Sequence, residues 1–267
     1  MRPYHVQDAE GLIKLDAMEN PYAWPEHLIE EWVQVLRKAT PNRYPDPICR
    51  PLKDLLRSFN EVPEGIELLL GNGSDEIIQI LLMALAPAAT VMAPEPTFVM
   101  YRQIAESLGL RFVGVPLMAE TFDLDLVRFS DLIEQHDPAL IFLAYPNNPT
   151  GNLFERSKVE AIISLAKGFV VLDEAYTPFA GDSFMGSLSR HDNLLVMRTL
   201  SKLGLAGLRL GFLCGLPEWI AEFEKLRLPY NINCLTQMTA AFALNHPEML
   251  NQQVRQILSD RRKMVQE

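Results

Sequence analysis

The segment IELLLGNGSDEIIQILLMAL, residues 66–85, decides the fold of this chain of 267 residues. It begins with a short apolar run, 66–70, and passes through a glycine-bearing turn into a helical window at 75–86. Apolar side chains in that window recur at the spacing of one helix face. They are Ile77, Ile80, Leu81, Ala84 and Leu85. The segment therefore predicts a strand followed directly by an amphipathic helix.

The same alternation of apolar runs and helical windows continues downstream. Further runs occupy 90–93, 111–115, 139–144, 169–172, 194–198 and 208–214, and further windows fall at 97–108, 123–136 and 155–167. Alternating strands and helices predict an α/β fold: a mostly parallel seven-stranded sheet with helices on both faces. Helices are also expected before the sheet, at about 25–38 and 48–59, and after it, at 217–226, 232–245 and 247–265.

Polar segments follow four of the apolar runs directly. They are Gly71-Asn72-Gly73-Ser74-Asp75-Glu76, Tyr145-Pro146-Asn147-Asn148-Pro149-Thr150-Gly151, Asp173-Glu174-Ala175-Tyr176 and Thr199-Leu200-Ser201-Lys202. Ligands of open α/β sheets bind at the carboxyl ends of the strands. The four segments therefore predict one ligand site at that edge of the sheet.

Lys202 is the candidate nucleophile, because it lies in an apolar, glycine-bearing stretch that ends at Arg209. Poor solvation and the cationic arginine both disfavour the ammonium form, which leaves an amine able to form a Schiff base with a carbonyl. The hydroxyls of Thr199 and Ser201, with Arg209, suit a phosphate. An aldehyde and a phosphate on one small molecule describe pyridoxal phosphate. From this stretch alone, the alternative interpretation of Lys202 is an ordinary solvated lysine beside a turn, with no role in binding.

Two other polar segments suit the same ligand. The turn with Gly73 and Ser74 joins a strand to a helix, so unpaired backbone N–H groups form an anion site there, or the serine is an ordinary helix cap. Asp173 closes an apolar strand. It either binds a pyridinium N–H, which keeps the ring protonated, or it caps the next segment or pairs with an arginine.

Three side chains are candidates for contacts to the ring itself. Tyr176 and Asn148 can each donate a hydrogen bond to a phenolate oxygen. A buried tyrosine finds other partners about as often, and Asn148 lies in a turn by composition. Phe98 can stack on a flat ring or simply fill the core.

Composition argues against several classes of partner. The net charge of −10, with dispersed basic residues, argues against nucleic acid. The N-terminus carries no apolar leader region and no window reaches about 18 continuous apolar residues, so we expect a cytoplasmic protein without a membrane span. Cys49, Cys214 and Cys234 lack metal-ligand spacing and the five histidines are scattered. We therefore expect reduced thiols and no metal.

The four polar segments, taken in order together with Arg209, closely resemble the fold-type I aminotransferases that use pyridoxal phosphate. Within that family the match is most similar to the histidinol-phosphate aminotransferases, on Met18-Glu19-Asn20-Pro21-Tyr22 and Arg43-Tyr44-Pro45. The resemblance runs from about residue 10 to the end. It implies amino transfer from L-histidinol phosphate to 2-oxoglutarate, giving imidazole-acetol phosphate and glutamate, in histidine biosynthesis.

The resemblance implies that Lys202, Asp173 and Tyr176 are the catalytic residues. Lys202 would be the Schiff-base lysine and the general acid and base, and Asp173 the partner of the ring nitrogen. Asn148 and Tyr176 would donate to the ring oxygen, and Phe98 would stack on the ring.

The resemblance also implies phosphate and substrate contacts. The phosphate would lie among Gly73, Ser74, Thr199, Ser201 and Arg209. Tyr44 would reach the phosphate of the neighbouring subunit in a homodimer, and Tyr22 and Asn20 would contact the substrate.

The sequence departs from the family pattern at three points. Phe98 stands where tyrosine is more common, and Lys202 and Arg209 are separated by one residue fewer than the commonest spacing. The chain also ends before the family's C-terminal small-domain sheet, whose arginines hold the substrate carboxylate or phosphate. A second interpretation is therefore a protein that binds the cofactor without catalysis. Other activities of this fold are further alternatives, namely transamination of aromatic amino acids and decarboxylation of a phosphorylated amino acid.

Three parts of the chain are expected. Residues 1–40 would form an N-terminal segment and helix, 41–230 the large cofactor-binding α/β domain, and 231–267 the helical start of an incomplete C-terminal small domain. The first 24 residues show little periodicity, so an extended path across the surface is expected.

Overall fold

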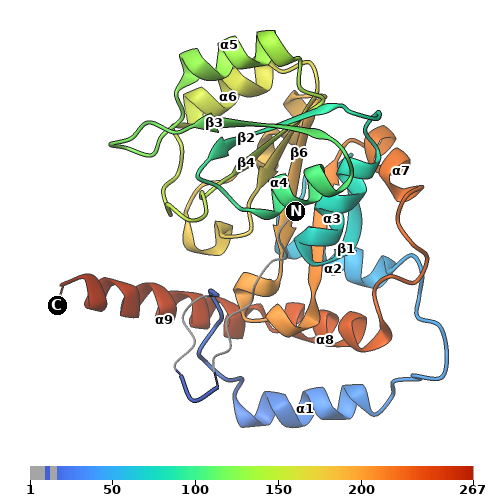
Figure 1. The fold of residues 1–267 in the computed structure, drawn as a ribbon. Coiled ribbons are helices and arrows are strands. Elements are labelled where there is room, and N and C mark those ends of the chain that lie inside the picture. The colour runs from blue at the N-terminus through green and yellow to red at the C-terminus, as the bar shows by residue number, and fades with distance from the viewer. Residues whose placement is uncertain (1–9, 13–16, 267) are drawn as a thin grey trace.

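A seven-stranded sheet lies at the centre of the computed structural model, which describes residues 10–12 and 17–266 (Figure 1). The strands are β1 (Glu67–Asn72), β2 (Thr90–Glu95), β3 (Arg111–Pro116), β4 (Leu140–Ala144), β5 (Phe169–Asp173), β6 (Leu194–Thr199) and β7 (Leu210–Gly215). Each strand coincides closely with one of the seven predicted apolar runs. Across the sheet their order is β1-β7-β6-β5-β4-β2-β3.

One strand of the sheet runs against the others. The pairs β2–β3, β2–β4, β4–β5 and β5–β6 are parallel, whereas β7 is antiparallel to both β1 and β6. The prediction of a mostly parallel sheet is confirmed. Because β7 is reversed, its amino end lies at the edge where the other strands have their carboxyl ends. Arg209, which directly precedes β7, is thereby brought to the edge of the predicted site.

Helices cover both faces of the sheet, as predicted. They are α1 (Glu26–Leu36), α2 (Arg50–Phe59), α3 (Gly73–Met83), α4 (Met100–Ser107), α5 (Leu126–His136), α6 (Arg156–Leu165), α7 (Pro217–Glu224), α8 (Cys234–Leu244) and α9 (Pro247–Gln266). Side chains of α3, α4 and α7 pack in one apolar cluster, and those of α2, α5, α6 and α8 in another. The sheet separates the two clusters.

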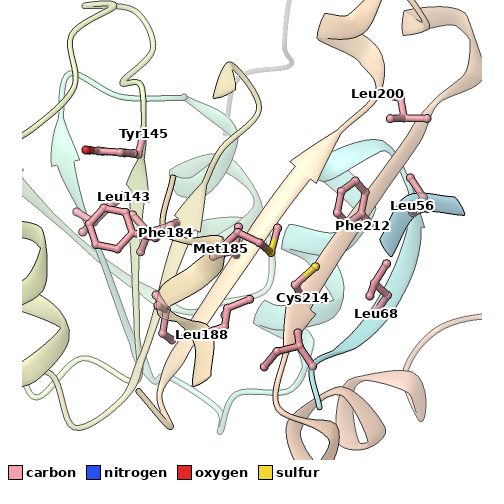
Figure 2. Packing of buried hydrophobic residues seen from close by; sticks show 14 of the residues in the cluster. Leu56, Leu68, Leu143, Tyr145, Phe184, Met185, Leu188, Leu200, Phe212 and Cys214 are labelled. Carbon is pink, nitrogen blue, oxygen red and sulfur yellow. The ribbon is translucent and has the colours of Figure 1, made fainter. Parts of the chain in front are cut away.

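Strand residues alternate between the two clusters, because successive side chains of a strand point to opposite faces. In β1, Leu68 and Leu70 belong to one cluster and Leu69 to the other. In β4, Leu143 and Phe142 divide in the same way. Figure 2 shows part of the cluster that contains Leu68 and Leu143. A strand buried on both faces needs a nearly continuous apolar run, which is why the runs could be recognised in the sequence.

The helices α1, α8 and α9 lie together at the end of the molecule away from α5 and α6 (Figure 1). Trp32 of α1 donates from Nε1 to the Thr239 hydroxyl of α8 at 3.0 Å. Trp24 packs edge-on to Trp32 and stacks on Phe242 of α8. These contacts attach the N-terminal helix to the helices that follow the sheet.

The segment at 17–25 has no helix or strand, in line with the expected extended path, and 1–9 and 13–16 lie outside the described residues. The buried Gln253 of α9 holds this segment, donating to the carbonyls of Tyr22 and Ala23. The division of the chain into three domains stays a prediction. Within 10–12 and 17–266, no helix is both long and apolar enough to cross a lipid bilayer.

Candidate active site

A pocket at the carboxyl ends of β4, β5 and β6 brings the four polar segments together. We call it the strand-end pocket. The predicted ring contacts Phe98, Asn148, Asp173, Tyr176 and Lys202 all line it. The predicted phosphate contacts Ser74, Thr199, Ser201 and Arg209 line it as well. Residues from distant parts of the sequence therefore meet in one cavity.

Asp173 is the most deeply buried ionisable group of this pocket, with 5% of its surface exposed. Its Oδ2 accepts a hydrogen bond from the Tyr101 hydroxyl at 2.6 Å, and its Oδ1 accepts one from the backbone N–H of Ala175 at 3.1 Å. Burial raises the pKa of the carboxyl to about 6, although both hydrogen bonds favour the charged form. A cationic group in the pocket would relieve this cost.

Lys202 reaches the same pocket from the short helical turn Ser201–Leu203 after β6. Burial is the main cause that lowers the pKa of its amine, and the nearby Arg209 lowers it further, against the carboxylates of Glu19, Asp173 and Asp75. Nζ donates to the Met18 carbonyl at 3.2 Å and lies 5.4 Å from the centre of the Tyr176 ring. The amine is thus partly desolvated and covered by the N-terminal segment.

Ser74 and Asp75 at the start of α3, and Arg209 just before β7, also line the pocket. Gly73 begins α3 with a φ of +78°, and a Cβ there would lie 2.6 Å from Nη2 of Arg209. Only glycine allows the guanidinium to approach the helix N-terminus so closely. Arg209 also donates to Asp75 at 3.1 Å, in a pair that is about half exposed. Backbone N–H groups of the first helical turn and the guanidinium therefore converge on one place, which suits an anion.

The hydroxyls of Thr199 and Ser201 bond to each other at 2.9 Å. The Thr199 hydroxyl also accepts from the backbone N–H of Ser201, which shapes the turn into Lys202. Tyr176 is half-buried, and burial followed by the charge of Asp173 raises the pKa of its hydroxyl, so it remains a donor. All three residues line the strand-end pocket.

Three of the predicted residues lie away from the pocket in this single chain. Asn20 donates to Gln253 at 2.7 Å, and the Tyr22 hydroxyl bonds to Asp260, so both side chains bind α9. Tyr44 is 82% exposed and stacks on Tyr230, with ring centres 4.6 Å apart. Among the described residues that line the strand-end pocket, these three are not found. Their predicted roles stay predictions.

Sequence reasoning missed Tyr101. It lies in the first turn of α4, three residues after Phe98, which precedes the helix. Both residues fall in the predicted helical window 97–108, where a spacing of three is the signal that could have placed their side chains on one face. The Phe98 ring, which lines the pocket, meets the Tyr101 ring edge-on at 5.5 Å.

Glu174 has a different partner from Asp173, its neighbour in sequence. Its carboxylate is fully buried and accepts from Nε and Nη2 of Arg198 and from the backbone N–H of Phe184. The strand alternation points the two acidic side chains away from each other. Glu174 and Arg198 form a structural ion pair, and neither residue lines the strand-end pocket.

A second cavity of about 400 Å³ adjoins the strand-end pocket and shares Pro146, Asn148 and Tyr176 with it. Met18 and Arg261 also line this second cavity. Its volume lies within the range of small-molecule sites.

Known proteins share this fold and this sequence pattern. The family model described as aminotransferase class I and II matches residues 10–267. The chain belongs to the class I and II aminotransferases. This aminotransferase is 58% identical over 259 residues to histidinol-phosphate aminotransferase 2 of Nitrosococcus oceani, which covers 97% of the chain and 72% of the relative.

Two further comparisons agree. Histidinol-phosphate aminotransferase 2 of Cupriavidus pinatubonensis is 51% identical to this aminotransferase over 272 residues, covering 100% of the chain and 74% of the relative. The crystal structure of the histidinol-phosphate aminotransferase from Clostridium acetobutylicum matches with a TM-score of 0.82 at 25% identity, covering 94% of this chain and 75% of that one. The similarity thus spans the sheet and the strand-end pocket.

Proposed function

We propose that this aminotransferase moves the amino group of L-histidinol phosphate to 2-oxoglutarate, giving imidazole-acetol phosphate and glutamate, as a step of histidine biosynthesis. Pyridoxal phosphate is the cofactor. One observation carries the proposal: Lys202 and Asp173, the two residues that this chemistry requires, line one pocket with an anion site at its end. The names of the relatives, at 51% and 58% identity, support the substrate.

The residues of the strand-end pocket fit pyridoxal phosphate. The buried carboxyl of Asp173, with its raised pKa, suits a pyridinium N–H, which is both a donor and a cation. Gly73 leaves a cradle that a Cβ would fill, beside the guanidinium of Arg209, and Ser74, Thr199 and Ser201 add hydroxyls for a phosphate. The Lys202 amine, with its lowered pKa, suits an aldehyde. When bound, the cofactor supplies that aldehyde carbon and a protonated ring that accepts electrons.

The residues of the pocket have separate roles in the proposed reaction. Asp173 keeps the ring nitrogen protonated. Nζ of Lys202 takes a proton from the α-carbon of the substrate and returns one, as general base and then general acid. Asn148 and Tyr176, which line the pocket, would donate to the ring oxygen, and Phe98 would stack against the ring. Met18, whose carbonyl accepts from Lys202, holds the N-terminal segment over the amine and limits access of water.

The second cavity is the proposed place of the substrate's side chain. It shares Asn148 and Tyr176 with the cofactor pocket, so a molecule bonded near Lys202 can extend into it. Asn20 and Tyr22 remain proposed substrate contacts. Both belong to the segment that is held against α9, and Arg261 of α9 lines this cavity.

An amino-donor assay tests the substrate. We expect purified protein loaded with pyridoxal phosphate to form glutamate from 2-oxoglutarate and histidinol phosphate. The kcat/KM for histidinol phosphate should be roughly 10⁴-fold above that for histidine or phenylalanine, because a site built to bond a polar group of the substrate, here its phosphate, rejects donors that lack it.

Two results of this assay would contradict the proposal. Activity on phenylalanine alone, or release of carbon dioxide from threonine phosphate, would assign another reaction of the same fold. Cofactor binding without turnover of any donor would favour a non-catalytic protein. Initial rates should fit a ping-pong scheme if the two half-reactions alternate.

We also propose that the chain acts as a homodimer in the cytoplasm. Exposed apolar side chains gather around the loop that carries Tyr44; we call them the loop patch. Its members are Tyr44, Ile48, Leu228, Tyr230 and Leu235. The loop is held in place, since Gln237 donates to the Asp46 carbonyl and Arg227 to the Pro47 carbonyl. Contiguous exposed apolar surface is typical of an interface, and a fixed loop can present Tyr44 to a partner's phosphate.

Ile48→Asp combined with Leu228→Asp is expected to convert the dimer into monomers, because two charges would be buried at the interface. Sedimentation velocity measures the change. Since Tyr44 is proposed to serve the partner's site, cofactor affinity should fall as well, by about tenfold. Val127→Asp, at an equally exposed apolar side chain on α5, is the control. A double variant that stays dimeric would exclude the loop patch as the interface.

A further inference from the structure

Tyr101 connects α4 to the catalytic carboxylate from outside the pocket. Its side chain is fully buried, and its hydroxyl donates to Oδ2 of Asp173 at 2.6 Å across 72 positions of sequence. Burial and the adjacent carboxylate raise the pKa of this phenol well above its ordinary value, so it stays protonated and remains a donor. The hydrogen bond is charge-assisted and therefore among the stronger ones in a protein.

The ring of Tyr101 is held rigidly. It stacks on Phe142 of β4 with ring centres 4.4 Å apart and an angle of 1° between the planes. Phe98 meets it edge-on from the pocket side. Two aromatic neighbours therefore leave the ring little freedom, and the hydroxyl is directed at one position.

The two oxygens of Asp173 have donors from two different elements. Oδ2 receives the Tyr101 hydroxyl from α4, and Oδ1 receives the backbone N–H of Ala175 at 3.1 Å. Together these two donors define the plane of the carboxylate. A carboxylate offers about four acceptor positions, so positions remain for a donor in the pocket.

We propose that Tyr101 is a positioning residue, whose hydroxyl orients the Asp173 carboxylate toward the ring nitrogen of bound pyridoxal phosphate. The inference rests on the proposed function, because it requires that cofactor in the strand-end pocket. Tyr101 acts only through Asp173. Its contribution to binding therefore depends on the ring nitrogen of the ligand.

The test compares two ligands in equilibrium dialysis. One is pyridoxal phosphate, and the other is its carbocyclic analogue, in which C–H replaces the ring nitrogen. Tyr101→Phe keeps the aromatic stack and removes only the hydroxyl. We expect it to weaken binding of pyridoxal phosphate by about tenfold and to leave binding of the analogue unchanged. A role in packing alone would affect both ligands equally.

Tyr145→Phe is the matched control. It removes a hydrogen bond of similar length, 2.7 Å, from another buried tyrosine to Asp182. It should change the affinity for neither ligand. Asp173→Asn provides a second background, because Tyr101→Phe added to it should cause no further loss if the hydroxyl acts through the carboxylate.

Equal weakening of both ligands, or no weakening of either, would overturn the role of Tyr101 and leave the proposed function standing. A further loss in the Asp173→Asn background would also overturn it. If the unaltered protein fails to bind pyridoxal phosphate, both proposals fall together. A selective loss, confined to the ligand with the ring nitrogen, supports the inference.

Discussion

Lys202→Met is expected to lower kcat by about 10³- to 10⁴-fold, because it removes the amine that we propose moves the proton. Methionine keeps the length of the side chain and its apolar stem. The amine is partly buried with a lowered pKa, so losing it costs the fold little beyond its hydrogen bond to the Met18 carbonyl. Steady-state rates with histidinol phosphate measure the loss.

The proposed covalent attachment of the cofactor to Lys202 gives a second measurement. Borohydride should fix the cofactor irreversibly to the unaltered protein, and mass spectrometry of its peptides should locate the modification at residue 202. The Lys202→Met variant should show none. Lys167→Met, at a lysine whose side chain is 83% exposed, is the control and should behave as the unaltered protein does. A modification that persists in Lys202→Met would assign the role to another lysine.

Asp173→Asn is expected to weaken binding of pyridoxal phosphate by about a hundredfold, while it stabilises the cofactor-free protein at neutral pH. The loss of affinity follows from removing one partner of a buried charged pair. Equilibrium dialysis measures the affinity, and urea unfolding followed across pH measures the stability.

The sign of the stability effect follows from the pKa of Asp173, which is about 6 in the folded chain and 3.8 ordinarily. The folded state holds this proton more tightly than the unfolded state does. The carboxyl's contribution to stability is therefore most favourable below its unfolded pKa, is lost as pH rises through about 6, and is constant above about pH 7. A pKa difference of about 2 corresponds to roughly 3 kcal/mol.

The free energy of unfolding of Asp173→Asn, minus that of the unaltered protein, should therefore rise by roughly 3 kcal/mol between about pH 3 and pH 7. An asparagine cannot accept both the Tyr101 hydroxyl and the Ala175 N–H as a carboxylate does, which offsets the gain by about 1 kcal/mol at every pH. The carboxylates of Asp75 and Glu174 contribute to the raised pKa and are unchanged in the variant. A difference that does not vary with pH would show that Asp173 is ionised without cost.

The sequence alone predicted the strands, the helices and most residues of the strand-end pocket. Apolar runs and helix periodicity are local signals in the sequence. The runs of β4, β5 and β6 are nearly continuous because these strands are buried on both faces. The position of Asp173 or Lys202 directly after a strand is equally local. Parallel strands bring their carboxyl ends to one edge, so these local positions already implied that the segments meet.

Only the tertiary structure decided which contacts complete the site. The direction of β7 depends on the strands it pairs with, and its reversal is what brings Arg209 to Gly73. The bond from Tyr101 to Asp173 joins residues 72 positions apart, and no period in the sequence reports such a pair. Local patterns record which side chains are buried and which follow a strand, whereas partners across the sheet are chosen by packing of the whole chain.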